Sequence, residues 1–123
     1  MYEYKSKLIR VVDGDTVDCM IDLGFDIKVR KRVRLAGINA PESRTKNLEE
    51  KKRGLAAKER VIELLNSSNN NDEFIIRTEY DRSGKYGRVI GTIILTIGPT
   101  LINESLNDIL VSEGHAVRKD YSK

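Results

Sequence analysis

The sequence predicts an α+β fold that is mainly β, in which five short strands form a small barrel accompanied by two helices. Two observations support this class. Apolar and polar residues alternate in short segments bounded by glycine and aspartate, as expected for half-buried strands. The apolar period becomes helical after Asn47 and again after residue 101. At 123 residues the chain has the length of one domain, which we assign to residues 1–123.

The first three predicted strands follow one another with short turns. Residues 4–12 form the first strand, and Asp13-Gly14-Asp15 is a strong hairpin-turn signal after it. Residues 16–22 alternate between apolar and polar positions and form the second strand. Asp22-Leu23-Gly24-Phe25 is a second turn signal and leads into a third strand over 26–36. Consecutive strands joined by short turns predict an antiparallel meander.

A helix is predicted over residues 48–66. Asn47 can cap its N-terminus, with Glu50 in the capping-box position three residues later. Gly54 interrupts this helix and costs it about 1 kcal/mol relative to alanine. The polar run over 66–72 forms a surface loop after it. The helix face predicted to be apolar contains Leu48, Leu55, Ile62 and Leu65.

Two more strands follow the first helix. Residues 74–79 alternate as a fourth strand, and residues 88–97 form a fifth strand rich in β-branched residues. The polar, glycine-containing segment 80–87 is the loop between them. Gly98-Pro99-Thr100 breaks the fifth strand, because proline cannot donate to a strand ladder.

A second helix is predicted over residues 102–113, with Gly114 placed to terminate it. Its inward-facing residues are predicted to be Leu106, Ile109 and Leu110. The charged tail, 115–123, frays or crosses the surface. This order of elements is that of an OB-fold, a five-stranded Greek-key barrel that commonly binds oligonucleotides and oligosaccharides. Another small barrel and an open α+β sheet are the alternatives.

Composition limits the possible partners and compartments. The formal net charge of +3 permits a polyanionic partner. No segment approaches the ~20 apolar residues that span a membrane, and residues 1–7 lack the pattern of a secretory signal. We therefore predict a cytoplasmic protein without a membrane partner. The single cysteine, Cys19, excludes an intrachain disulfide and a thiolate metal cluster, and it is predicted to be a buried strand residue.

Basic residues occupy every second position of the third predicted strand, namely Lys28, Arg30, Arg32 and Arg34. In an unbroken strand all four share one face. That face is either a solvated outer surface or part of a polyanion-binding site, and the charge pattern alone supports both interpretations.

The segment 32–42 combines charged residues with a rigid turn. It begins as the third strand, breaks at Gly37 and turns at Pro41. Proline fixes its own φ and keeps the residue before it out of helical geometry, so Glu42 follows a stiff corner. Core packing requires neither Arg34 at the end of the strand nor a glutamate on the next turn. This charged pair is therefore a candidate for function.

Three further features are candidates. Asp15 follows the turn Asp13-Gly14, and hairpin chemistry does not require a second carboxylate there. Lys85-Tyr86-Gly87-Arg88 supplies a second arginine, although a loop that closes onto a strand would also explain this string. His115 follows a helix end and is predicted to be a polar surface residue rather than a catalyst.

Taken together, these residues fit phosphoester chemistry. Carboxylate, amide and carbonyl oxygens suit Ca²⁺ or Mg²⁺, whereas the lack of Cys/His clusters in the sequence argues against zinc. Paired arginines can bind phosphate oxygens through two parallel hydrogen bonds. A nearby carboxylate can orient or deprotonate a water molecule. The residues alone therefore predict a phosphoester site on a small barrel.

Three strings resemble the signature segments of the staphylococcal nuclease-like (thermonuclease) family: Val12-Asp13-Gly14-Asp15-Thr16, Arg34-Leu35-Ala36-Gly37-Ile38-Asn39-Ala40-Pro41-Glu42 and Lys85-Tyr86-Gly87-Arg88. They occur in the family's order, with the predicted helix between the second and the third. Residues 102–106 also resemble the start of the family's penultimate helix, so the resemblance extends from Lys7 to about Ala116.

The resemblance implies a Ca²⁺-dependent endo- and exonuclease that acts on DNA and RNA and leaves 3′-phosphates. It implies that Arg34 and Arg88 bind phosphate and stabilise the transition state. For Glu42 it implies the role of general base or water-orienting group. We expect a monomer that prefers single strands, because a small open groove reaches an unpaired backbone more easily than a duplex.

The resemblance also implies binding roles. Asp15, Asn39 and the backbone carbonyl of Ala40 correspond to metal ligands, and Lys85 and Tyr86 to residues that contact a terminal phosphate. Asn39 departs from the best-known members, which have a second aspartate there. Because calcium affinity depends on ligand charge, we predict weaker Ca²⁺ binding than with aspartate.

Two other departures affect the substrate-binding surface. The segment between Asp15 and Arg34 is longer than in the secreted prototype and implies an extended hairpin beside the site. The family's final helix has no counterpart after Gly114, and Tyr121 matches its base-stacking tyrosines only loosely, so base preference stays open. An inactive OB-fold nucleic-acid-binding module and a protein-interaction module are the alternatives, and both are disfavoured by the retained arginines and Glu42.

Overall fold

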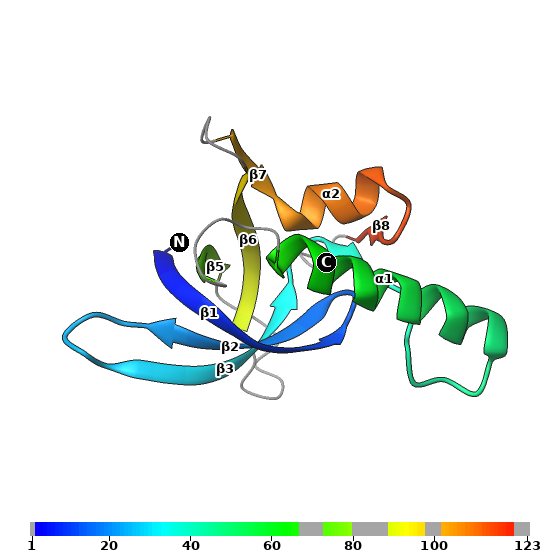
Figure 1. The fold of residues 1–123 in the computed structure, drawn as a ribbon, viewed down its shortest axis with the longest axis horizontal. Helices are drawn as coiled ribbons and strands as arrows, with labels where there is room; N and C mark the ends of the chain where they lie inside the picture. Colours follow the sequence, from blue (N-terminus) through cyan, green and yellow to red (C-terminus); the bar gives the residue numbers. More distant parts are fainter. Residues whose placement is uncertain (1, 67–72, 80–88, 98–101, 120–123) are drawn as a thin grey trace.

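The computed structural model describes residues 2–66, 73–79, 89–97 and 102–119 of the chain. Lys85, Tyr86, Arg88 and Tyr121 lie outside these ranges. The elements, labelled as in Figure 1, are β1 (Tyr2–Asp13), β2 (Thr16–Asp22), β3 (Lys28–Leu35), β4 (Ile38–Asn39), α1 (Leu48–Asn66), β5 (Glu73–Glu79), β6 (Val89–Ile97), β7 (Ile102–Ser105), α2 (Leu106–Ser112) and β8 (Val117–Arg118).

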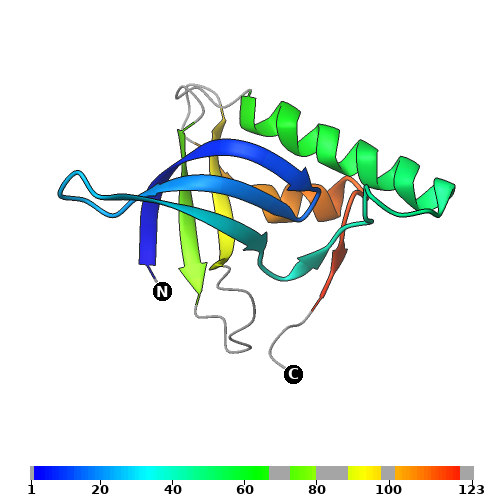
Figure 2. The same cartoon turned by 90° about the horizontal axis from the view of Figure 1, so that it is seen from below.

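Five of these strands close a barrel. β1, β2 and β3 form the predicted antiparallel meander, and β5 and β6 continue the sheet from the other side of β1. A parallel pairing between β3 and β6 closes the sheet on itself, with Arg34 opposite Ile90. Figures 1 and 2 show this curved sheet with α1 and α2 near one end of it. The prediction of a mainly β, five-stranded OB-fold barrel with two helices is confirmed.

The hydrophobic core fills the barrel and the space beneath the helices. The inward-facing residues of β2 are buried as alternation predicts, and Cys19 is among them. Burial raises the pKa of the Cys19 thiol to about 12, so this side chain is a packed core residue. Further fully buried side chains come from β3, β4, α1, β5, β6 and α2: Val33, Leu35, Ile38, Val61, Leu65, Ile76, Ile93, Leu95, Leu106 and Leu110.

The bounds of α1 agree with the prediction, but the predicted apolar face is wrong in its first half. Leu48 is 79% exposed and Leu55 is 48% exposed. The buried face is Gly54, Ala57, Val61, Leu64 and Leu65. Small residues form the part of the helix that approaches the barrel most closely, and a pattern based on leucine spacing does not include them. At the N-terminus, the backbone N–H of Glu50 donates to Asn47 Oδ1 at 3.2 Å, as expected for a cap.

The predicted second helix begins four residues late. Residues 102–105 form β7, which pairs antiparallel with β6, and the helix starts at Leu106. Ser105 is its N-cap, because its hydroxyl accepts a hydrogen bond from the backbone N–H of Asp108. At the other end, Gly114 has a φ of +81° directly after the C-cap residue, so the predicted stop is correct.

The chain after α2 returns to the segment that follows β3. Val117 pairs with Asn39, and Arg118 pairs with Ile38, which makes a two-stranded sheet of β4 and β8. The backbone N–H of Lys119 then donates to the carbonyl of Gly37. The sequence predicts that the tail frays or crosses the surface. Its described part, through Lys119, crosses the surface and pairs with residues 37–39. This pairing gives the segment that contains Asn39 a fixed backbone.

Candidate active site

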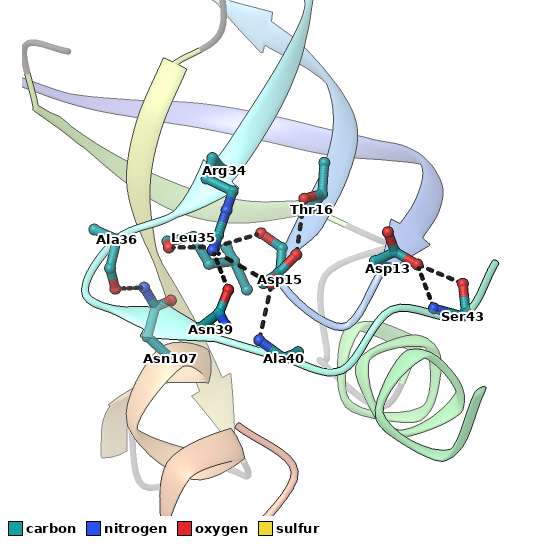
Figure 3. A network of polar contacts seen from close by, with 10 residues as sticks. All are labelled: Asp13, Asp15, Thr16, Arg34, Leu35, Ala36, Asn39, Ala40, Ser43 and Asn107. Carbon is teal, nitrogen blue, oxygen red and sulfur yellow. Dashed lines mark hydrogen bonds and ion pairs between the residues drawn. The ribbon is translucent and has the colours of Figure 1, made fainter. Parts of the chain in front are cut away.

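Asp15 lies at the turn between β1 and β2 and joins this hairpin to the segment after β4. The residue is buried, with 8% of its surface exposed. Oδ2 accepts a hydrogen bond from the backbone N–H of Ala40 at 2.8 Å, and Oδ1 accepts one from the Thr16 hydroxyl at 2.9 Å. Figure 3 shows these contacts at the centre of a polar network. Hydrogen bonds to both oxygens offset the cost of burying the charge.

Arg34, at the end of β3, is the cation of this network and is also 8% exposed. Its Nη2 lies 3.4 Å from Asp15 Oδ2 and donates to Asn39 Oδ1 at 3.1 Å. Its Nη1 donates to the backbone carbonyls of Asp15 and Leu35 at 3.3 and 3.1 Å. A buried guanidinium surrounded by oxygen acceptors is electrostatically compensated and fixed in direction.

The structure therefore brings together four of the eight residues predicted for the site, Asp15, Arg34, Asn39 and Ala40. Glu42 follows on the same segment as Asn39 and Ala40, and it is exposed. Lys85, Tyr86 and Arg88 are outside the described residues. His115 is half-buried and lines a hollow of about 450 Å³ between α1 and the chain after α2, whose wall also includes Asn39 and Ala40.

Two carboxylates hold the segment around Glu42 at both ends. Asp15 accepts from the N–H of Ala40, two residues before Glu42. Asp13 accepts from the N–H of Ser43 at 3.2 Å and from the Ser43 hydroxyl, directly after Glu42. The turn between β1 and β2 thus fixes the backbone on either side of Pro41-Glu42. An exposed side chain on a backbone held in this way is positioned with little freedom in its Cα–Cβ direction.

Two glycines allow this segment to approach the barrel and α1. A Cβ on Gly54 would lie 2.3 Å from the carbonyl oxygen of Glu42, so α1 can contact this backbone only through a glycine. A Cβ on Gly14 would lie 2.7 Å from Cβ of Ala57 and 3.0 Å from Cβ of Ala40. Gly54 is therefore part of the site's architecture, although the sequence shows it only as a weak point in a helix. Gly14 is needed for close packing, which turn chemistry alone does not reveal.

Sequence reasoning did not identify Asp13, Ser43 and Gly54 as contributors to the site. An aspartate at position 13 is expected in a turn of this kind without any further role, and its partner Ser43 is 30 residues away. No local pattern predicts such a pairing. The one available signal was the polar residue Ser43 directly after the Pro41-Glu42 corner, but its burial becomes visible only in the fold.

The donor set is compatible with a hard cation. Asp15 offers a carboxylate, Asn39 an amide oxygen and Ala40 a backbone carbonyl, and Ca²⁺ binds oxygen ligands of these kinds. Only Asp15 among these three carries a charge, and Arg34 lies 3.4 Å from it. Within the described residues, no three His, Cys, Asp or Glu side chains are gathered in a metal-binding cluster. The residues therefore fit calcium in ligand chemistry, with a low charge count that predicts modest affinity.

The fold and this site define a small OB-type barrel with a buried arginine–carboxylate pair, Arg34 and Asp15, and an exposed glutamate, Glu42, on the segment that contacts this pair through Asn39 and Ala40. The family model described as Staphylococcal nuclease homologue (SNase) matches residues 32–123. The chain therefore belongs to the staphylococcal nuclease homologue family. The matched part includes Arg34, Asn39, Ala40 and Glu42, whereas the turn with Asp15 precedes it.

No curated protein sequence matched the chain. In the part of the chain that the structure describes, no helix is both long enough and apolar enough to cross a membrane.

Proposed function

We propose that this protein is a calcium-dependent nuclease that hydrolyses phosphodiester bonds of single-stranded DNA or RNA and leaves 3′-phosphates. Family membership makes nuclease activity plausible. The observation that carries the proposal is the fixed guanidinium of Arg34, paired with Asp15, beside a segment that presents Glu42 to solvent. A binding surface alone would not require a glutamate whose backbone is held on both sides by carboxylates, the buried Asp15 and the half-buried Asp13.

In this proposal Arg34 binds non-bridging phosphate oxygens and stabilises the charge that develops on them during displacement. Arg88 acts with it. Arg88 directly precedes Val89 in sequence, and Val89 pairs with Val33 next to Arg34. This register supports a shared site for the two arginines. Glu42 orients or deprotonates the attacking water, and Lys85 and Tyr86 bind the terminal phosphate.

Asp15, Asn39 and the carbonyl of Ala40 would hold the calcium ion. When bound, a divalent cation polarises a phosphoryl oxygen as a Lewis acid and neutralises part of its charge. The hydrogen bonds from Thr16 and Ala40 to Asp15 hold this carboxylate in place beside Arg34.

The test is cleavage of single-stranded DNA and of RNA with Ca²⁺ or with a calcium chelator. We expect Ca²⁺-stimulated cleavage with 3′-phosphate ends, and a loss of about 10²-fold or more in Arg34→Ala. Because Arg34 is buried, Arg34→Lys is a second variant that keeps the charge but loses the bidentate geometry. Arg77→Ala is the matched control, because Arg77 forms an exposed ion pair with Glu3.

Cleavage that is unchanged in both Arg34 variants would show that the site is misassigned. A second candidate function, an inactive nucleic-acid-binding barrel, is favoured by one observation. The Arg34 guanidinium is already contacted by oxygens of Asp15, Leu35 and Asn39, which compete with a substrate phosphate. Binding of single strands without Ca²⁺-stimulated cleavage would establish this second function.

A further inference from the structure

The hairpin of β2 and β3 extends away from the barrel. The two strands pair without interruption from Thr16 opposite Arg34 to Asp22 opposite Lys28. β3 pairs with β6 through residues 33–35, and its first half pairs with β2 but with no other strand in the part of the chain that the structure describes. Figures 1 and 2 show the hairpin projecting to the left of the barrel in both views. Its outer part is therefore not needed to close the barrel.

The tip of this hairpin presents apolar side chains to solvent. Phe25 is 96% exposed. Its neighbours Leu23 and Ile27 are 44% and 53% exposed. The exposure is not a result of missing hydrogen bonds in the turn, because the N–H of Leu23 donates to the carbonyl of Ile27 and the N–H of Gly24 donates to Asp22 Oδ1.

The backbone at the tip also favours a function over a folding role. Phe25 has a φ of +55°, in the left-handed region that bulky residues rarely adopt. A closed turn that holds a phenylalanine in a disfavoured conformation, fully exposed, is costly for a chain that needs only to fold. Strained residues of this kind are concentrated at ligand-binding positions.

A basic surface leads from the tip toward Arg34. Lys28 and Arg30 are exposed on the face of β3 that ends at Arg34, and within the described residues neither forms an ion pair. Further along the same face, Arg32 and Arg10 share the single carboxylate of Asp18, at 2.9 and 3.1 Å. One carboxylate compensates only one of these two guanidinium groups. Asp22 lies opposite Lys28 on this face, so its two aspartates, Asp18 and Asp22, face the four cations Lys28, Arg30, Arg32 and Arg10, and the net charge of the face is positive.

We propose that this surface, formed by Phe25, Lys28, Arg30 and Arg32, binds single-stranded nucleic acid and guides it to Arg34. Phosphates would contact the basic side chains, and an unpaired base would stack on Phe25. An aromatic residue next to a basic track is the combination by which proteins bind single strands without sequence preference. A duplex offers no exposed base face to Phe25. The inference rests on the proposed function for its substrate class and adds a binding surface outside the site.

The test separates binding from cleavage. Binding of a fluorescent single strand of about 16 nucleotides is measured by anisotropy in chelator, where no Ca²⁺-stimulated cleavage occurs. We expect Phe25→Ala to weaken binding about tenfold, Phe25→Tyr to retain it, and Phe25→Leu to lose as much as Phe25→Ala. Leucine keeps apolar surface but cannot stack, so this variant distinguishes a base from a protein or lipid contact.

The charge contribution is tested by the double variant Lys28→Ala, Arg30→Ala. We expect about tenfold weaker binding and a slope of log K against log salt that is shallower by about 1.4, from two lost phosphate contacts. The matched control is Lys51→Ala, Lys52→Ala, which removes the same charge from the exposed surface of α1. Circular dichroism melting of every variant shows whether the fold is intact.

Unchanged binding in the Phe25 and Lys28/Arg30 variants would overturn the inference, even if the protein cleaves nucleic acid. Equal losses in the Lys51/Lys52 control, equally tight binding of a duplex, or wild-type binding by Phe25→Leu would also contradict it. If the wild type binds but does not cleave, and the hairpin variants bind weakly, the nuclease proposal fails and the hairpin surface stands. A trinucleotide too short to reach the tip should be cleaved equally by wild type and Phe25→Ala.

Discussion

The hydrogen bond between Arg34 Nη2 and Asn39 Oδ1 determines what a charge at position 39 would do. With asparagine, Asp15 is the one charged side chain among the three predicted metal ligands, and its Oδ2 lies 3.4 Å from the guanidinium. An aspartate at position 39 would pair with Arg34 and free part of the Asp15 charge for a cation. In the wild-type site the Asp15 carboxylate already pairs with Arg34, so less of its negative charge is available to a cation.

We therefore expect Asn39→Asp to bind Ca²⁺ more tightly, by about tenfold, because calcium affinity rises with ligand charge. The measurements are the dissociation constant by calorimetry and the Ca²⁺ concentration that gives half-maximal cleavage. The first readout does not depend on activity. Asn66→Asp, an identical change at the exposed end of α1, is the control. An unchanged dissociation constant and midpoint in Asn39→Asp would rule out a metal-binding role for this position.

At the residue scale, the sequence predicted the grouping of Asp15, Arg34, Asn39 and Ala40, because short strings around a strand end and a turn carry that information. Their roles in catalysis and metal binding stay predictions. It did not predict the contact from Asp13 to Ser43. A hydrogen bond between residues 30 positions apart depends on how the β1–β2 turn packs against the segment after β4, and no local sequence pattern predicts that packing.

At the scale of elements, α1 and the Glu42 segment are joined by a backbone contact rather than by large side chains. The carbonyl oxygen of Glu42 occupies the position that a Cβ on Gly54 would need. The neighbouring residue Leu55 is 48% exposed and contributes little burial. The site and the helix are thus mechanically linked at one residue.

Gly54→Ala should destabilise the protein by about 1–3 kcal/mol through overpacking against backbone. On helix propensity alone, the same change should stabilise it by about 1 kcal/mol. Because the clash is with the backbone of Glu42, we also expect kcat to fall in the protein that remains folded, beyond any loss caused by unfolding. Leu55→Ala is the neighbouring control and should change stability by about 0.5 kcal/mol or less. Urea unfolding and kcat are the measurements. A more stable Gly54→Ala protein with normal kcat would show that this contact is unimportant.

Asp18 connects three strands, because it accepts from Arg10 of β1 and Arg32 of β3 while lying on β2. The Arg32 guanidinium, with a smaller effect from Arg10, lowers the pKa of the Asp18 carboxyl below its ordinary value of 3.8. A lowered folded-state pKa stabilises the fold above the unfolded-state value, and this stabilisation disappears as the pH falls through the folded-state value.

We expect Asp18→Asn to be less stable than wild type at pH 7, and the difference should shrink as the pH falls below about 4. Urea unfolding of both proteins at several values between about pH 3 and pH 7 measures this difference. Asp22→Asn, a half-buried aspartate at the end of the same strand, serves for comparison. A difference that is constant with pH would mean that the ion pairs of Asp18 do not contribute to folding.

Among the elements, long periodic ones were predictable and short ones were not. The strands β2 and β5 and the helix α1 lie within one residue of their predicted bounds, because alternation or helical period extends over their whole length. β4, β7 and β8 are two to four residues long and exist because a distant strand lies beside them. Residues 102–105 have a helical pattern when considered alone, and pairing with β6 overrides it.

At the scale of the whole molecule, closure of the barrel places Arg34. The parallel pairing of β3 with β6 sets Arg34 opposite Ile90, and it comprises three residue pairs within the described ranges of the two strands. Asn107 of α2 reinforces it from the side. Its Nδ2 donates to the carbonyls of Ala36 and Gly91 at 2.8 and 3.3 Å, and its Oδ1 accepts from the N–H of Ile93 at 3.3 Å. One buried side chain thus connects the second helix to both strands of the closing pair.

We expect Asn107→Ala to lower the free energy of unfolding by about 3 kcal/mol, because it removes the hydrogen-bond partners of buried backbone groups. Asn107 contacts none of the three predicted metal ligands through these hydrogen bonds. The free energy of Ca²⁺ binding to the folded protein should therefore change less than the free energy of unfolding. Thermal and urea unfolding measure the first quantity and calorimetry the second. Asn66→Ala, at the exposed end of α1, is the matched control and should stay within about 0.5 kcal/mol of wild type. If Asn107→Ala is as stable as this control, the β3–β6 pairing closes the barrel without help from α2, and the position of Arg34 depends on the strands alone.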